Sequence, residues 1–210
     1  KLLILDFSYE GVSGHHHALN KLIVTAAEQA GLPAHVLANK QISPALINAH
    51  IHPFFSRGTY GPVTTTRQAR KKLQRTTRSF FRDMLEAGFH KAPHDTTFLV
   101  HTANAAHVLA VACFLKLSRR NCPTNVYLML PPNFDAPSPE AQAIQASSYE
   151  QAFDIAGNMP NIRFLCENRL LQAAYTSMGC RHIDLLDLPC ELPERPIAKM
   201  QSQRLELLFI

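Results

Sequence analysis

The sequence predicts a doubly wound α/β fold, in which helices cover both faces of a mostly parallel, Rossmann-like sheet. Short continuous apolar runs alternate with longer stretches of helical periodicity along residues 1–188, which is the order expected of parallel strands joined by crossover helices. The first run lacks the strict alternation of a half-exposed strand, as expected for a strand buried on both faces. Hydrophobic residues make up 46% of the 210 residues, which is enough for an ordinary folded core.

The N-terminal segment predicts the first strand–helix–strand unit. Residues 1–7 (KLLILDF) predict a buried strand that ends at a glycine-containing turn, and residues 34–39 (AHVLAN) predict the second strand. The helix between them is expected to end at Gly31. Its apolar positions at helical spacing are Leu19, Leu22, Ile23, Ala26, Ala27 and Ala30.

The same order recurs through the rest of the chain. Ser138 stands at a helix cap position, Pro139 at the first helical position and Gly157 just past the end of that helix. Residues 41–62 are rich in proline, glycine and aromatic residues without a period, so we expect a long loop there. The further strands are expected within residues 97–103, 124–132, 161–168 and 181–189, and the further helices within residues 67–88, 105–120, 138–157 and 169–179.

The end of the chain has the composition of a domain boundary. Residues 189–203 contain three prolines and few apolar side chains, which is typical of a linker. Residues 204–210 (RLELLFI) then predict the first strand of a second domain. We therefore expect residues 1–188 to form the N-terminal domain of a longer protein.

The net charge of +5 is concentrated in one predicted helix. Residues 67–82 contain seven basic residues and no acidic one, so the remainder of the chain sums to −2. Such a basic helix face suits anionic lipid headgroups or another polyanion, although a merely solvated surface remains open. Because no reading motif or set of exposed aromatic residues accompanies it, we expect no nucleic-acid partner. The cations are Arg67, Arg70, Lys71, Lys72, Arg75, Arg78 and Arg82.

Cysteine usage and hydropathy indicate a cytoplasmic protein. Five cysteines without a C-x-x-C pair argue against a disulfide framework and a structural zinc cluster. The longest apolar stretch is interrupted by His101, Asn104 and His107, so we expect no membrane-spanning helix. No basic leader precedes an apolar segment, and we expect no signal peptide.

Histidines follow two of the predicted strands. Ligands of open α/β sheets bind outside the carboxyl ends of the strands, which selects residues 8–17, 101–107 and 131–135. The first two segments would bring five histidines to one edge of the sheet: His15, His16, His17, His101 and His107.

The segment SGHHHALN, residues 13–20, has several interpretations. A metal site is weakly supported, because consecutive residues at a helix start point about 100° apart and no two-histidine-plus-carboxylate spacing follows. A purification tag would be longer and terminal, whereas a solvated helix cap stays open. We favour a cradle for a diphosphate, in which Gly14 allows close approach and the amides of His15 and His16 face the anion. The absence of a G-x-G-x-x-G fingerprint argues against a nicotinamide or flavin cofactor.

His101 stands where a strand is expected to end. A histidine there can exchange a proton with a bound hydroxyl near neutral pH, and the alternative is a buried histidine bonded to a backbone carbonyl. We expect His101 to be catalytic. The expected substrate-binding residues are Gly14, His15, His16, Thr102 and Asn104.

Together these features resemble the N-terminal half of GT-B glycosyltransferases of the glycosyltransferase family 4, or group 1, type. The resemblance implies two Rossmann-like domains facing across a cleft, with the acceptor held mainly by the N-terminal domain and the nucleotide-sugar mainly by the other. It rests on the apolar strand and glycine turn before residues 15–39 and on residues 97–110 (TFLVHTANAAHVLA), 164–180 (FLCENRLLQAAYTSMGC) and 188–196 (LPCELPERP).

The resemblance also assigns roles to residues of this chain. In the family a glycine pair follows the first strand near the donor diphosphate; Gly14 matches its first member, and His15 stands in place of the second. The cleft histidine of the family corresponds to His101, with Asn104 in the following helix turn.

The activity implied is transfer of a sugar, with retention of configuration, from a nucleotide-sugar donor to a saccharide or lipid-linked acceptor. The nucleotide-sugar is a co-substrate, no metal or other cofactor is implied, and enzymes of the family often work at the cytoplasmic membrane face. Without most of a donor domain, the 210-residue chain alone is expected to be inactive. Two other classes stay open: a non-catalytic binding or interaction domain, and another α/β enzyme with a nucleotide or phosphate ligand.

Overall fold

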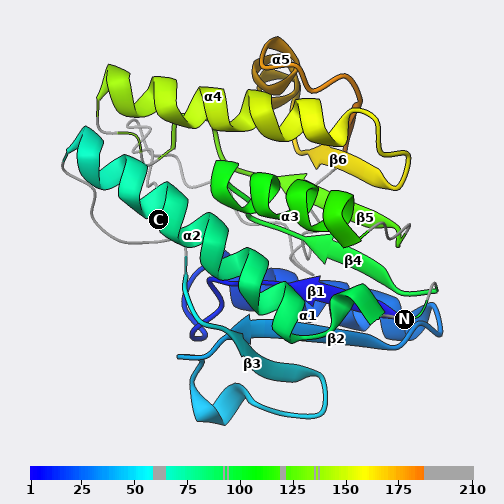
Figure 1. Ribbon diagram of the computed structural model, residues 1–210. Coiled ribbons are helices and arrows are strands. Elements are labelled where there is room, and N and C mark those ends of the chain that lie inside the picture. The colour runs from blue at the N-terminus through cyan, green and yellow to red at the C-terminus, as the bar shows by residue number, and fades with distance from the viewer. Residues whose placement is uncertain are drawn as a thin grey trace, which may run out of the picture.

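The computed structural model describes residues 1–58, 65–91, 93, 95–118, 122–134, 136 and 138–186. Its elements follow the predicted alternation of strands and helices (Figure 1). The strands are β1 (Leu2–Leu5), β2 (Ala34–Asn39), β3 (Ile51–Phe55), β4 (Thr97–Val100), β5 (Thr124–Leu128), β6 (Ile162–Cys166) and β7 (Ile183–Leu185). The helices are α1 (His15–Gln29), α2 (Thr66–Glu86), α3 (Ala105–Ser118), α4 (Pro139–Ala156) and α5 (Arg169–Ser177), with short 3-10 turns η1 (Pro44–Leu46) and η2 (Phe89–Lys91).

The seven strands form one parallel sheet in the order β3-β2-β1-β4-β5-β6-β7. From β1 the chain first adds strands on one side, through β2 and β3, and then crosses back to add β4 to β7 on the other. Helices α2, α3 and α4 lie side by side on one face, while α1 lies behind β1 on the opposite face (Figure 1). This is the doubly wound α/β fold that the sequence predicts.

The core lies mainly between the sheet and the α2–α3 layer. Phe7 packs edge-on against Phe80, with ring centroids 5.4 Å apart, and Phe55 stacks on Phe80 at 4.9 Å. All three rings are buried, and burying each phenyl group contributes roughly 1.5–3 kcal/mol. These contacts fix α2, and the segment that follows β1, against the sheet.

Local signals place the helix ends where the sequence predicts them. The Ser138 hydroxyl accepts a hydrogen bond from the Ala141 N–H at the start of α4, and Pro139 is its first residue. At the end of α1, Gly31 has a φ of 69°, and the Leu32 N–H donates to the Ala27 carbonyl, which closes the helix as a left-handed glycine does.

Part of the segment expected to be a long loop is an edge strand. Residues 51–55 form β3, which pairs in parallel with β2, and Pro44–Leu46 form a 3-10 turn. The expectation was wrong there because Pro53 breaks the strand pattern of the sequence, yet an edge strand tolerates a residue without an N–H. Residues 59–62 of that expected loop, the expected linker 189–203 and the expected strand 204–210 lie outside the described residues.

Candidate functional site

The expected site lies where the strand order reverses. Asp6 follows the last residue of β1 and His101 follows the last residue of β4, and these two strands are neighbours in the sheet. On the β1 side of this pair the chain builds β2 and β3 outward, and on the β4 side it builds β5, β6 and β7 outward, so the strand order reverses between β1 and β4. In open α/β sheets such a reversal separates the flanking loops and opens a crevice that holds ligands.

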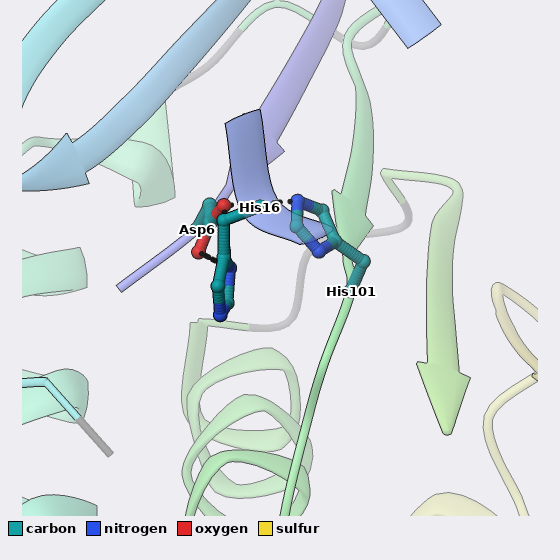
Figure 2. Close-up of side chains that lie close together, drawn as sticks. All are labelled: Asp6, His16 and His101. Atoms are coloured by element: carbon teal, nitrogen blue, oxygen red, sulfur yellow. Dashed lines mark hydrogen bonds and ion pairs between the residues drawn. The ribbon is translucent and has the colours of Figure 1, made fainter. Parts of the chain in front are cut away.

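A buried carboxylate, that of Asp6, is the centre of the site. Figure 2 shows the rings of His16 and His101 facing it, each joined to it by a dashed line. His16 Nδ1 lies 2.9 Å from Oδ1, and His101 Nε2 lies 3.2 Å from Oδ2. The Asn20 amide donates to Oδ2 at 2.6 Å and the Ser8 N–H donates to Oδ1 at 3.2 Å. Four donors from three segments of the chain therefore converge on one carboxylate.

These donors keep Asp6 ionised although it is completely buried. Burial by itself would raise the pKa of the Asp6 carboxyl, because the charged form loses its hydration. The attraction of His101, followed by the hydrogen bonds from His101 and His16, outweighs burial and holds the pKa well below its usual range. The site thus contains a permanent buried negative charge at neutral pH.

The hydrogen-bond pattern determines the tautomer of His101. The ionised Asp6 can only accept, so the Asn20 NH₂ group faces it, and Asn20 Oδ1 faces His101 Nε2 at 2.9 Å. Since both neighbours of Nε2 are acceptors, the proton of the neutral ring resides on Nε2. Nδ1 is then an acceptor, and the Thr102 hydroxyl lies 3.0 Å from it.

Thr102 links the buried network to an exposed histidine. Its Oγ1 also lies 3.3 Å from Nε2 of His15, whose side chain is exposed. Thr102 has a φ of 55° and is the one non-glycine residue with a positive φ in the part of the chain that the structure describes. For a β-branched residue this backbone is strained, at a cost of about 1–3 kcal/mol.

Gly14 forms the exposed entrance to α1. It has a φ of 80° and a ψ of −176°, a region that essentially only glycine adopts. No atom lies within 4 Å of the position that a Cβ would take there. The glycine is therefore required by the backbone turn rather than by lack of space.

We expect Gly14→Ala to lower the free energy of unfolding by about 1–3 kcal/mol, because alanine strains this backbone conformation. Gly11→Ala is the matched control, since a Cβ at Gly11 also meets no atom and its φ lies outside the positive range. The control should change stability by less than about 0.5 kcal/mol. Urea denaturation of the two variants measures the difference, and equal effects would contradict the role given to Gly14.

A cavity of about 230 Å³ lies between α1 and residues 45–51, beside the Asp6 network. Its lining is mixed, with apolar side chains such as Val24 and Leu46 and polar side chains such as Lys21 and Asn48. Asn20, which bonds Asp6 and His101, forms part of the wall. Tyr9 and His17 also line it, and their side chains are hydrogen-bonded to each other at 2.8 Å.

Asp6, His16 and His101 are also the one group among the described residues whose His, Cys, Asp or Glu ligand atoms all lie within 4.8 Å of one another. Two imidazoles and a carboxylate are ligands that zinc or iron accepts. Each ligand atom of the three already takes part in the hydrogen bonds described above, so the network is complete without an ion. The expectation that no metal is needed stays a prediction.

The structure brings together most, but not all, of the predicted site residues. Gly14, His15, His16, Thr102 and His101 lie within one connected region. His101 is completely buried, and its partners are side chains rather than a backbone carbonyl. His16 is buried against Asp6.

The remaining predicted residues lie elsewhere. The Asn104 side chain accepts from the Ala106 N–H and so caps α3. It also borders a small cavity lined by Lys72 and Gln145. The His107 ring stacks on Phe7 in the core, with centroids 3.4 Å apart.

The basic segment forms helix α2 as predicted, with an exposed face of cations. Phe80 and Met84 are buried on its inner side, and Arg82 pairs with Glu86 one turn away. Lys72 differs from the others because it is partly buried beside Asn104. The exposed cations are Arg67, Arg70, Lys71, Arg75, Arg78 and Arg82.

Sequence reasoning missed two residues of the site. Asp6 and Asn20 are not part of any spacing motif with His101. His101 is 95 residues after Asp6 and 81 residues after Asn20. The available signal was an acidic residue directly after an apolar strand, at the edge where ligands bind.

None of the helices within the described ranges combines the length and apolar character needed to cross a membrane. The chain matches no model of a known protein family, and it matches no curated protein sequence. The doubly wound parallel α/β fold and the geometry at its switch point are therefore the basis for any conclusion about function.

Proposed function

We propose that this chain is the acceptor-side, N-terminal half of a GT-B glycosyltransferase that transfers a sugar from a nucleotide-sugar to a saccharide or lipid-linked acceptor, with retention of configuration. The observation that carries the proposal is the convergence of Asp6, His101, Thr102 and His15 at the point where the strand order reverses. The resemblance of the sequence to the family 4 type supports the same assignment.

The surroundings of this cluster suit a polyhydroxylated ligand. The adjoining 230 Å³ cavity combines apolar walls with hydroxyl, amide and ammonium groups, which is how sites for small polar ligands are built. Saccharide recognition requires many donors and acceptors at fixed positions. The tyrosine, asparagine and lysine side chains of this wall supply both kinds of group.

The start of α1 suits the departing diphosphate. Its first turn contains no acidic residue, and the preceding Gly14 is exposed. The positive end of the helix dipole favours an anion there. Charge that develops on the leaving group would be stabilised in this way without a bound metal or other cofactor.

The exposed cations of α2 fit an anionic membrane surface as a further partner. A lipid-linked acceptor would be reached from such a surface, and each cation near anionic headgroups contributes about 1 kcal/mol. The proposed location is the cytoplasmic face of a membrane. No nucleic-acid partner is proposed.

The test uses the longest natural protein that contains these 210 residues. It is incubated with a panel of UDP-, GDP-, ADP- and dTDP-sugars and with saccharide or lipid-linked acceptors, in the presence of anionic or zwitterionic vesicles. We expect release of nucleoside diphosphate with one donor class, an α-linked product from an α-linked donor, and binding to the anionic vesicles only. Product linkage is read by NMR spectroscopy.

Binding is tested on the 210-residue chain itself. Acceptor saccharides should shift the backbone amide NMR signals of Gly14, His15 and Thr102 more than those around the exposed Arg163–Asp184 pair. Absence of transfer with every donor, together with unchanged amide signals, would contradict the proposal. Binding without transfer would instead favour a non-catalytic binding domain, which the buried and fully bonded state of His101 makes the second candidate.

A further inference from the structure

The buried position of His101 raises the question of which group at this site meets a substrate. The His101 side chain is completely buried, and both of its ring nitrogens have hydrogen-bond partners. His16 is buried as well and faces Asp6. His15 is the exposed imidazole connected to them.

We propose that His15 is the catalytic base of this site, and that Asp6, His101 and Thr102 are positioning residues that fix its tautomer through a chain of hydrogen bonds. The substrate would be the acceptor hydroxyl, so its identity rests on the proposed function. The hydrogen-bond chain itself is independent of that identity.

The direction of each hydrogen bond follows from the buried end. In its neutral form, which has one ring proton, His101 carries that proton on Nε2, because Asp6 and Asn20 Oδ1 both accept there. Nδ1 of His101 therefore accepts the hydroxyl proton of Thr102, 3.0 Å away. The Met129 sulfur, at 3.5 Å from the same hydroxyl, is a weaker and more distant acceptor.

Because the hydroxyl proton of Thr102 is donated to His101, the Thr102 oxygen can only accept a hydrogen bond from His15. The Nε2–H tautomer of His15 is thereby favoured, and Nδ1 keeps the lone pair of the neutral ring. Within the described part of the chain, no hydrogen-bond partner of His15 Nδ1 is found. A proton-accepting nitrogen is thus available on an exposed side chain that is hydrogen-bonded to the buried network.

Two further observations agree with this assignment. Partial burial, together with smaller effects of His16 and His101, lowers the pKa of His15, which favours its proton-accepting form. The second observation is the strained backbone of Thr102, because a φ of 55° has a free-energy cost for threonine. That conformation holds the hydroxyl between the two imidazoles, and strain of this kind clusters at functional sites.

The proposed step is balanced in atoms and charge. The acceptor hydroxyl approaches the sugar C1 from the face that the diphosphate leaves, which retains the configuration, and it gives its proton to His15 Nδ1 while its oxygen forms the bond to C1. The C1–O bond to the donor phosphate breaks, and the nucleoside diphosphate leaves with the bonding pair. The His15 imidazolium is stabilised through Thr102 and His101 by the Asp6 carboxylate, and it then loses its proton to solvent. A neutral His15 with an outward lone pair suits a hydroxyl better than a diphosphate oxygen, which itself can only accept.

The first test needs no substrate. Long-range ¹H–¹⁵N NMR spectra of the 210-residue chain report the tautomer of each histidine, and His15→Gln assigns the His15 signals. We expect the Nε2–H tautomer at His15 to predominate by at least tenfold. Thr102→Val, which removes the hydroxyl but keeps the β-branched shape, should reduce this preference to less than threefold. Thr102→Ser retains the hydroxyl and should preserve it, so a failure of the valine variant to fold does not remove the test.

The second test uses the transfer assay of the longer protein. His15→Gln should lower kcat by 10²–10⁴-fold with little change in KM, which is the usual contribution of a general base. Thr102→Val should lower kcat about tenfold, and Thr102→Ser should not. A predominant Nδ1–H tautomer, or transfer that survives His15→Gln, would overturn the assignment of His15 while leaving the proposed function intact. The expected tautomer without transfer from any donor would overturn the proposed function and leave the hydrogen-bond chain in place.

Discussion

Asp6→Ala is expected to lower the free energy of unfolding by about 3–5 kcal/mol at pH 7, which is the usual cost of removing one partner of a buried charge cluster. The carboxylate is completely buried and accepts from the Ser8 N–H, His16, Asn20 and His101. Removal leaves these donors without that acceptor in a region from which water is largely excluded. Unfavourable desolvation of the donors then adds to the cavity left by the side chain.

The matched control is Asp184→Ala. Asp184 also forms a short ion pair, with its Oδ2 2.6 Å from Nε of Arg163, but both side chains are more than half exposed. Solvent screening limits such a pair to about 1 kcal/mol or less. Urea denaturation of both variants measures the contrast, and a similar small effect of the two substitutions would show that the Asp6 network does not stabilise the fold.

Asp6→Asn separates shape from charge. Asparagine fits the same space, but its NH₂ group is a donor. It would face hydrogen-bond donors that the carboxylate oxygen of Asp6 accepts from. We expect this variant to be destabilised as well and to lose the Nε2–H tautomer of His101, because the strongest acceptor of that proton is gone. The same histidine NMR spectra that test His15 report this change.

The sequence was sufficient for the helices and for all strands except β3, because each of these elements has a local signal. Residues 34–39 were predicted as a strand with the same bounds that the structure has, and the Ser138–Pro139 pair marks the start of α4. The edge strand β3 has no such signal. Its five residues include His52 and Pro53, and its pairing with β2 is determined by tertiary packing rather than by propensity.

The candidate site was predicted only in part, because the sheet topology and not a local signal brings some of its residues together. The rule that ligands bind at the carboxyl ends of parallel strands selected His15 and His101 from their positions alone. Asp6 and Asn20 join them only because β1 and β4 are neighbours, a pairing that depends on the whole topology. The positive φ of Thr102 also lacks a sequence signal, since threonine rarely adopts it.

His107 is expected to make the chain sensitive to acid. Burial, and to a smaller extent the charge of Lys72, lowers the pKa of His107 to about 3. The Asn104 N–H lies 3.4 Å from Nδ1, so the proton of the neutral ring resides on Nε2. Nε2 is buried and has no hydrogen-bond partner within the described ranges. A second proton would place a charge on a buried ring that is stacked on Phe7 and packed edge-on against Phe80.

The sign of the pH effect follows from this lowered pKa. The unfolded chain takes up a proton at His107 near pH 6.5, whereas the folded chain does so only near pH 3. Stability from this group is therefore complete above about pH 6.5 and is lost as the pH falls through the window between the two values. At 1.36 kcal/mol per pH unit, the loss between pH 7 and pH 4 is about 3 kcal/mol.

Urea denaturation across pH 4–7 measures this loss, with His107→Phe and His107→Leu as comparison variants. Both remove the titrating ring, and phenylalanine can still stack on Phe7. Whatever their stability at pH 7, the two variants should lose about 3 kcal/mol less than the wild type between pH 7 and pH 4, because only the wild type takes up the His107 proton on unfolding. Parallel pH profiles for all three proteins would mean that His107 is protonated alike in the folded and unfolded chain, and would refute its assignment as a neutral core residue.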